Sequence, residues 1–327
     1  MTVIRRAVRS LAVVVLGLTV ISARPAAGAK VTPADIETLS SETFAVIGDT
    51  PYSDIERAQF PSLIRHVNAD TAVSMVLHAG DIKSGESLCD NAVYQDRVSL
   101  FNSFADPFVF TPGDNEWTDC HRVEMGRYLP TERLGYLRQV FYPQPGVTLG
   151  QYPVLVQTQA SNPSYSSFRE NVLFERAGAV FATVHVVGSN NGRARWQGLA
   201  GGDQPSTRKA EYQARDAANL AWVGAAFDRA EAAGAAGVVL LMHAEPEART
   251  PYLAIRNRIV ARAKAFGGKV LLIHGDEHRY EAETSYAGVA NLTRLETFGT
   301  SASRWLQLTV DPGTSAVFSW VPRTVAP

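Results

Sequence analysis

Five short segments rich in glycine, aspartate and histidine, each placed directly after a run of apolar residues, constrain this chain most strongly. They read GDTPY from Gly48, GDIKSG from Gly80, PGDNEW from Pro112, MHAEP from Met242 and HGDEH from His274. In an open α/β sheet, the carboxyl ends of neighbouring strands meet at one edge, and ligands bind there. The segments therefore predict an α/β fold that presents carboxylates and histidines at the ends of its strands.

The apolar residues before the first three segments predict a β-α-β-α-β start. Strands are expected over residues 44–47, 73–77 and 108–110, with helices over 54–67 and 91–104 between them. In the first helix Asp54 is a reasonable N-cap. The apolar face of that helix has helical spacing and consists of Ile55, Phe60, Leu63, Ile64 and Val67.

The rest of the chain continues the alternation, and neither an internal repeat nor a linker divides residues 30–327, so we expect one domain. Residues 142–165 are rich in Pro, Gly, Gln and Ser and predict an insertion loop, a candidate lid over the site. Further strands are expected over 172–175, 180–187, 238–242 and 270–273, helices over 208–233 and 253–266, and antiparallel strands over 292–295, 306–310 and 316–320.

In this order, the five segments resemble the motifs of the calcineurin-like metallophosphoesterases, which read D-x-H, G-D, G-N-H-D/E, H and G-H-x-H. The resemblance covers Ala45 to about Arg279. It implies layered sheets flanked by helices, with a site at the carboxyl ends of the strands for two divalent metal ions (Mn, Mg, Ca, Fe or Zn). It also implies hydrolysis of a small-molecule phosphomonoester or phosphodiester by a metal-activated water.

Carried over residue by residue, the resemblance assigns six metal ligands. They are Asp49, Asp81, Asp114, His243, Asp276 and His278. Asp49 would hold the first ion and Asp81 would bridge both. Asp114 takes the place of the family asparagine on the second ion. Taken singly each residue has a plainer explanation, because a Gly-Asp pair after a strand is commonly a turn and a lone histidine is commonly a core residue.

Three motif histidines are replaced in this chain, and Asp276 stands in place of one of them in the closing motif. Pro51 stands where the first motif has a histidine ligand, and proline cannot bind a metal. Asn115 stands where the third motif has the histidine that contacts the phosphoryl group. An amide can donate a hydrogen bond there but cannot titrate as an acid. His121, six residues further on, is the candidate replacement acid, the alternative being a surface histidine in a loop.

The replacements keep a second function class open, a catalytically silent family member that binds a phosphorylated ligand or partner. They also change the charge of the site. In the family site, two carboxylates face two divalent ions, and the site keeps a positive charge. In this chain four aspartates would neutralise the two ions, so the site would attract a phosphate dianion less strongly. An oxygen-rich ligand set favours manganese, magnesium or calcium over zinc. Two alternatives therefore stay open: the site binds a single ion, or its substrate is a phosphodiester, which carries less charge than a monoester.

The two cysteines, Cys89 and Cys120, follow the second and third segments. A disulfide between them would close a loop of about 30 residues and stabilise the fold by about 3 to 4 kcal/mol. The alternative is a pair of free thiols. Neither cysteine has a nearby partner at the spacing that zinc requires.

The amino terminus has the pattern of an export signal. Arg5, Arg6 and Arg9 precede the apolar run 11–21, and Ala27 lies in a small-residue cleavage site. We expect a signal peptide over residues 1–29 and a secreted or periplasmic protein. The alternative is a membrane anchor, but the run falls short of the roughly 18 to 20 residues that span a bilayer.

Composition narrows the partners further. The formal net charge of −1 gives no footprint for nucleic acid or an anionic membrane surface. No later apolar segment is long enough to cross a membrane, and no pattern defines an oligomeric state.

The remaining polar residues near the segments have plainer expected positions. Three histidines are expected in the core, namely His78, His185 and His274, and three basic residues are expected on the solvated surface, namely Lys83, Arg122 and Arg279. Asn190 and Asn191 are expected to form a turn with possible substrate contacts, and Tyr52 has no specific expected role.

Overall fold

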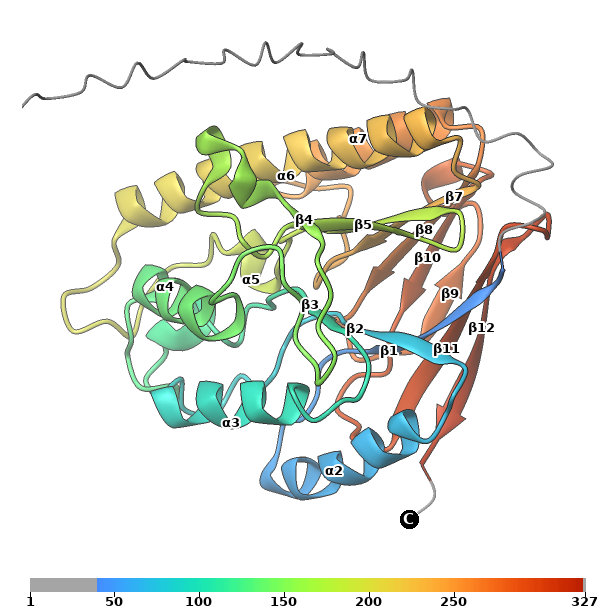
Figure 1. Ribbon diagram of the computed structural model, residues 1–327. Coiled ribbons are helices and arrows are strands. Elements are labelled where there is room, and N and C mark those ends of the chain that lie inside the picture. Colours follow the sequence, from blue (N-terminus) through green and yellow to red (C-terminus); the bar gives the residue numbers. More distant parts are fainter. Residues whose placement is uncertain (1–39, 326–327) are drawn as a thin grey trace, which may run out of the picture.

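Two β-sheets lie face to face between two layers of helices in the computed structural model, which describes residues 40–325 (Figure 1). One sheet has the strand order β12-β11-β1-β2-β3, and the other has the order β4-β5-β6-β7-β8-β10-β9. Helices cover the outer face of each sheet. This layered α/β arrangement confirms the fold class that the sequence predicts.

The central strands of each sheet are parallel, and antiparallel strands lie at one edge of the first sheet and at both edges of the second. β1, β2 and β3 run parallel in the first sheet, as do β6, β7, β8 and β10 in the second. The strands of the first sheet are β1 Glu42–Ile47, β2 Val73–His78, β3 Phe108–Phe110, β11 Arg304–Asp311 and β12 Val317–Thr324. Those of the second are β4 Gln157–Thr158, β5 Val172–Arg176, β6 Ala179–Thr183, β7 Gly237–Leu241, β8 Lys269–His274, β9 Glu281–Glu283 and β10 Leu292–Glu296.

One strand direction differs from the prediction. Residues 292–295 were expected to belong to an antiparallel set, but β10 runs parallel to β8 and is antiparallel only to the short β9. The antiparallel prediction holds for β11 and β12. The apolar pattern of a strand does not encode the direction of its neighbour, which explains the error.

Side chains of β1 show how three core layers form. Phe44 and Val46 point between the two sheets, whereas Ala45 and Ile47 point toward the helices, because successive side chains of a strand face opposite sides. On the second sheet, Trp222 of α6 packs in the other outer layer. The helices are α2 Asp54–Asn68, α3 Asn91–Phe101, α4 Pro130–Phe141, α5 Gly188–Asn191, α6 Pro205–Ala233 and α7 Leu253–Ala265.

The first helix agrees closely with the sequence prediction, apart from its cap and Ile55, which was expected on the apolar face but is 71 % exposed. Ser53, not Asp54, is the N-cap of α2, and its side chain accepts a hydrogen bond from Glu56 N at 3.2 Å. Ser53 has an extended backbone, as N-cap residues do, while Asp54 is already helical. Asp54 instead places a negative charge in the first turn, where it complements the helix dipole.

The segment after α4 does not form the expected lid. Leu149 pairs with Phe108 at the first residue of β3, and Gln151 N donates to Phe104 O at 2.8 Å. These contacts lie at the beginning of β3, opposite the end that leads into PGDNEW. The segment therefore closes an edge of the sheet, because its apolar and backbone groups find partners there.

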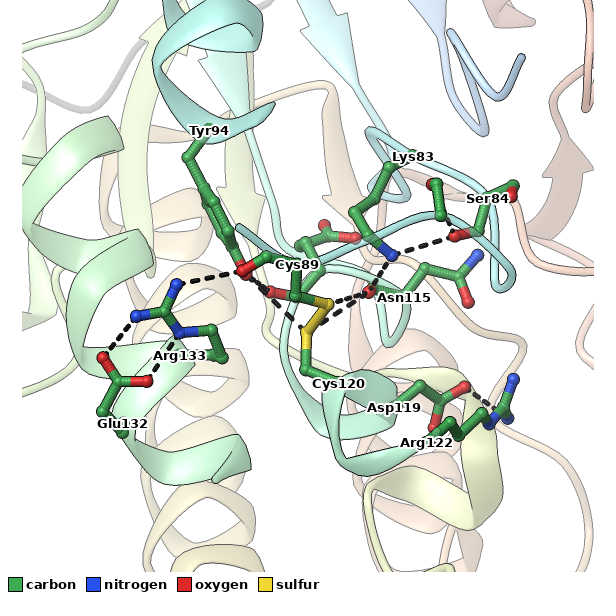
Figure 2. The surroundings of a disulfide bond; sticks show 12 residues. Lys83, Ser84, Cys89, Tyr94, Asn115, Asp119, Cys120, Arg122, Glu132 and Arg133 are labelled. Carbon is green, nitrogen blue, oxygen red and sulfur yellow. Dashed lines mark hydrogen bonds and ion pairs between the residues drawn. A yellow bond between two sulfur atoms is a disulfide. The ribbon is translucent and has the colours of Figure 1, made fainter. Parts of the chain in front are cut away.

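The predicted disulfide joins Cys89 to Cys120, with 5.7 Å between their Cα atoms (Figure 2). Both cysteines are fully buried. The bond connects the loop after β2 to the 3-10 turn Thr118–His121 after β3. It therefore fastens together two loops that carry predicted site residues.

The predicted signal peptide, residues 1–29, lies outside the described residues. Within residues 40–325, no helix combines the length and the apolar character needed to cross a bilayer.

Candidate metal centre

The ends of five strands bring the six predicted ligands together at one edge of the molecule. Asp49, Asp81 and Asp114 follow β1, β2 and β3 of the first sheet. From the second sheet, His243 follows β7, and Asp276 and His278 follow β8. The cluster therefore spans the carboxyl edges of both sheets.

His243 lies at the middle of the cluster. Its Nε2 atom is 3.0 Å from Asp114 Oδ1 and 3.4 Å from one carboxylate oxygen each of Asp81 and Asp276. Its Nδ1 atom lies 2.9 Å from Ala79 O. Because a carbonyl oxygen can only accept, Nδ1 carries a proton and donates a hydrogen bond to it. Nε2 is then left as the metal-binding nitrogen, an arrangement common among metal-bound histidines.

Asp49 has the clearest need for a cation. It is fully buried, and its Oδ1 atom accepts a hydrogen bond from Asp276 N at 3.1 Å. Its Oδ2 atom is buried, and no group among residues 40–325 forms a hydrogen bond with it. His278 Nε2 lies 3.5 Å from Oδ1 on the more exposed side of the cluster. A buried carboxylate oxygen without a partner is costly, and a metal ion would satisfy it.

The electrostatics of the cluster also fit a cation. Burial raises the pKa of Asp81 well above its usual range, and nearby carboxylates add to the effect. Burial alone would lower the pKa of His243, but the surrounding carboxylates, Asp81 foremost, outweigh it and raise that pKa well above its usual range. Both directions reflect negative charge concentrated in a buried space, which a divalent cation would offset.

Four of the six predicted ligands have a left-handed backbone. The φ angles are 53° at Asp49, 56° at Asp81, 78° at Asp276 and 60° at His278. Such angles are strained for residues other than glycine and cluster at functional sites. Here they occur in the sharp turns that leave the strand ends and aim these side chains at one another.

The turn at α5 closes one side of the cluster. A Cβ atom on Gly188 would lie 2.6 Å from both Asp114 Oδ1 and Asp276 Oδ1, so only glycine fits. Ser189, Asn190 and Asn191 then follow with positive φ angles. The turn predicted for GSNNG is confirmed, and Gly188 brings its backbone directly against two predicted ligands.

Asn115 holds the predicted bridging carboxylate in place. Its backbone N donates to Asp81 Oδ1 at 3.1 Å, and its side-chain Nδ2 donates to Asp81 Oδ2 at 2.5 Å. The side chain therefore lies against the cluster, where the phosphoryl contact predicted for it stays a prediction.

No sequence pattern singled out Tyr52, yet its hydroxyl group lies inside the cluster. It donates to Asp81 Oδ2 at 2.5 Å and lies 3.1 Å from His278 Nε2 and 3.4 Å from Asp49 Oδ1. Asp49 and Asp81 are predicted ligands of the ion that loses a histidine at Pro51, so the phenolic oxygen lies where it could supply a replacement ligand. The position of Tyr52, three residues after Asp49 and across a tight turn, is the one feature of the sequence that could have indicated its place in the site.

Replacing Tyr52 with phenylalanine is expected to weaken metal binding by about 10- to 100-fold, the usual cost of losing a group that binds or orients a ligand. Affinity is measured by competition with a chromophoric chelator. Tyr152→Phe is the matched control, because Tyr152 is 73 % exposed. Unchanged affinity in Tyr52→Phe would show that the hydroxyl neither binds nor orients the metal.

His121 lies apart from the six predicted ligands. No hydrogen bond or ion pair within the described residues joins it to them. Its side chain is buried in the wall of a neighbouring cavity, and its Nδ1 atom has no hydrogen-bond partner. Burial, followed by the Arg122 charge, lowers its pKa. Its role as an acid stays a prediction.

Two further predictions have clear outcomes. Lys83 was expected on the solvated surface, but it is fully buried. Two hydrogen bonds compensate the buried ammonium group, since its Nζ donates to Ser84 O at 2.9 Å and to Asn115 O at 2.8 Å (Figure 2). The core positions expected for three histidines are confirmed. They are His78, His185 and His274, each fully buried.

Residues 42–280 match the family model of the calcineurin-like phosphoesterases. The match includes all five segments and most of the described residues, and the chain belongs to this family. No significant match was found among curated proteins.

Solved structures with little sequence identity resemble the chain over most of its length. Purple acid phosphatase PPD1 from yellow lupin (Lupinus luteus) seeds is 10% identical with a TM-score of 0.41, and the match covers 88% of this chain and 54% of that one. GAP50, the anchor in the inner membrane complex of Plasmodium, is 9% identical with a TM-score of 0.43, covering 88% and 90%. The calcineurin-like phosphoesterase YfkN from Bacillus subtilis is 10% identical with a TM-score of 0.45, covering 87% and 91%.

Proposed function

We propose that this protein hydrolyses a phosphomonoester or phosphodiester with a water molecule activated by divalent metal ions. The observation that carries the proposal is the convergence of Asp81, Asp114 and Asp276 on His243, beside a buried Asp49 oxygen that has no hydrogen-bond partner within the described residues. Membership of the calcineurin-like phosphoesterases supports the reaction class.

Each residue has a defined part in this proposal. Bound divalent ions would lower the pKa of a coordinated water and polarise the phosphoryl oxygens. Asp81 lies between the two groups of predicted ligands, near both Tyr52 and His243, and is the candidate shared ligand. Asn115 fixes Asp81 through two hydrogen bonds and offers an amide near the phosphoryl position. The oxygen-rich set suits manganese, magnesium or calcium better than zinc.

The decisive experiment combines metal content with turnover. Protein stripped with a chelator is reloaded with Mn, Mg, Ca, Fe or Zn, and hydrolysis of 4-nitrophenyl phosphate and bis(4-nitrophenyl) phosphate is followed. We expect turnover that returns with metal and is highest with manganese or magnesium. Stoichiometric metal binding without hydrolysis of either ester, under all five metals, would contradict the proposal.

His121 is the proposed proton donor to the leaving group, since Asn115 cannot titrate. His121→Ala is expected to slow hydrolysis of substrates with poor leaving groups by about 100-fold or more, because the alkoxide then departs unprotonated. An activated aryl ester should react almost as before. The measurement is kcat for an alkyl and a nitrophenyl phosphate. Equal losses on both esters would assign His121 another task, and no loss on either would make it a wall residue only.

Export is part of the same proposal. The Cys89–Cys120 disulfide supports a secreted or periplasmic location, because such bonds persist in oxidising compartments.

A further inference from the structure

A cavity of about 580 Å³ lies between the chain that follows the 3-10 turn Thr118–His121 and the chain that follows α5. One wall is the chain from His121 to Glu124, which follows the loop of Asp114 and Asn115, and the other includes Arg195 and Gln197. The metal chemistry described above uses none of these groups except the proposed acid His121.

Arg122 connects this cavity to the metal centre. Its Nη2 atom lies 3.4 Å from Ser189 Oγ, in the turn that packs against the cluster. A Cβ atom placed on Gly85 would lie 3.3 Å from Arg122 Nη1 and 3.1 Å from Asn115 Oδ1, so these two atoms flank the same small space. The guanidinium group therefore lies close to the Asn115 amide while also lining the cavity.

The guanidinium group of Arg122 is held in place. It pairs with Asp119 Oδ2 at 2.5 Å (Figure 2). Ser189 Oγ in turn donates to Asp119 Oδ1 at 2.6 Å. Asp119 itself is almost fully buried, whereas the Arg122 side chain is 38 % exposed. A fixed and partly exposed guanidinium group can bind an anion with little further loss of freedom.

Arg195 adds a second and much freer positive charge. Its side chain is 73 % exposed and lies 3.7 Å from Asp203 Oδ2, an oxygen that Arg208 already binds at 2.8 Å. The cavity lining carries one acidic residue, Glu124, against these two arginines. The His121 Nδ1 atom in the same wall has no partner. The lining therefore has unused capacity for a negatively charged ligand.

We propose that this cavity binds a negatively charged group on the leaving-group side of the substrate. The inference rests on the proposed function. With the phosphoryl group at the metal centre, the rest of the molecule would extend past Asn115 and Arg122 into the cavity, and Arg195 would contact its far end. The substrates are then phosphoesters with a second anion, a carboxylate or a phosphate, and not simple alkyl or aryl esters.

Binding tests the inference without turnover. Calorimetry of the manganese-loaded protein compares 4-phosphonobutanoate with 4-phosphonobutanamide, which cannot be hydrolysed and differ only in the terminal charge. We expect the carboxylate to bind about 10-fold more tightly, as a charge-assisted hydrogen bond allows. Arg195→Gln should bring the ratio close to one, whereas Arg65→Gln, an exposed arginine of α2, should preserve it. Propane-1,3-bisphosphonate shows whether phosphate is preferred to carboxylate.

Equal binding of the acid and the amide, or a ratio that Arg195→Gln leaves intact, would overturn the inference. Hydrolysis of 3-(phosphonooxy)propanoate and its amide is measured in parallel. Turnover of both esters at equal kcat/KM, together with equal binding of the phosphonates, would refute the anion site and leave the proposed hydrolysis standing. Selective binding without turnover of either ester would support the anion site and refute the hydrolysis of phosphomonoesters.

Discussion

Asp81→Asn is expected to strip the protein of most of its metal and to abolish hydrolysis. Asp81 accepts hydrogen bonds from Tyr52 and Asn115 on one side and approaches His243 Nε2 within 3.4 Å on the other. Asparagine has nearly the same shape but lacks the charge that a shared ligand supplies. The loss should exceed the about 10- to 100-fold that follows removal of a group that only orients a ligand.

The measurement is metal content by elemental analysis, with activity on a nitrophenyl ester. Asp54→Asn is the matched control, because Asp54 is an exposed aspartate in the first turn of α2. The control should keep both metal and activity. Full metal content in purified Asp81→Asn would contradict the assignment of Asp81 as the shared ligand, whatever happens to turnover.

The sequence predicted the parts of this fold that depend on local pattern. Apolar runs followed by Gly-Asp located the ends of β1 and β2. Gly-Asp pairs favour a turn, and in an α/β sheet the turns at the carboxyl ends of the strands carry the binding residues. The helical spacing of Phe60, Leu63, Ile64 and Val67 located α2 almost to the residue. The order of the five segments then indicated the family, and the family implied the layers.

What the sequence missed depends on contacts between distant residues. Tyr52 belongs to the cluster because its turn leads its hydroxyl group toward Asp81, 29 residues away, and His278, 226 residues away. The sequence suggests a surface lysine at position 83, but Lys83 Nζ donates a hydrogen bond to the carbonyl of Asn115. The direction of β10 and the course of the segment after α4 are likewise set by neighbours that no local pattern encodes.

The changes in the family motifs form a connected set in space. The proline at position 51 cannot bind a metal, and we propose the adjacent Tyr52 hydroxyl, 3.4 Å from Asp49 Oδ1, as the replacement ligand. Aspartates at 114 and 276 lower the positive charge of the site, and Arg122 lies near Asn115 at its rim. These neighbours make altered metal preference and altered substrate charge the expected results of the changes.

The Cys89–Cys120 bond is expected to contribute both stability and metal affinity. The two sulfur atoms lie 3.5 and 3.7 Å from Asn115 O, the carbonyl that Lys83 also binds (Figure 2). The bond closes a loop with a sequence separation of 31 residues. Its removal should therefore lower the free energy of unfolding by about 3 to 4 kcal/mol. It should also loosen the loop that aims Asp114 at His243.

The test is the double variant Cys89→Ser with Cys120→Ser, compared with the oxidised parent by denaturant unfolding and metal titration. A reductant should destabilise the parent and leave the double variant unchanged, because the chain has two cysteines in all. A change below about 0.5 kcal/mol, the size of an ordinary surface substitution, would show that the bond does not stabilise the fold. Two alkylatable thiols in protein taken from an oxidising compartment would show that the bond does not form there. Unchanged metal affinity in a destabilised double variant would separate the two effects and show that the strand ends alone aim Asp114.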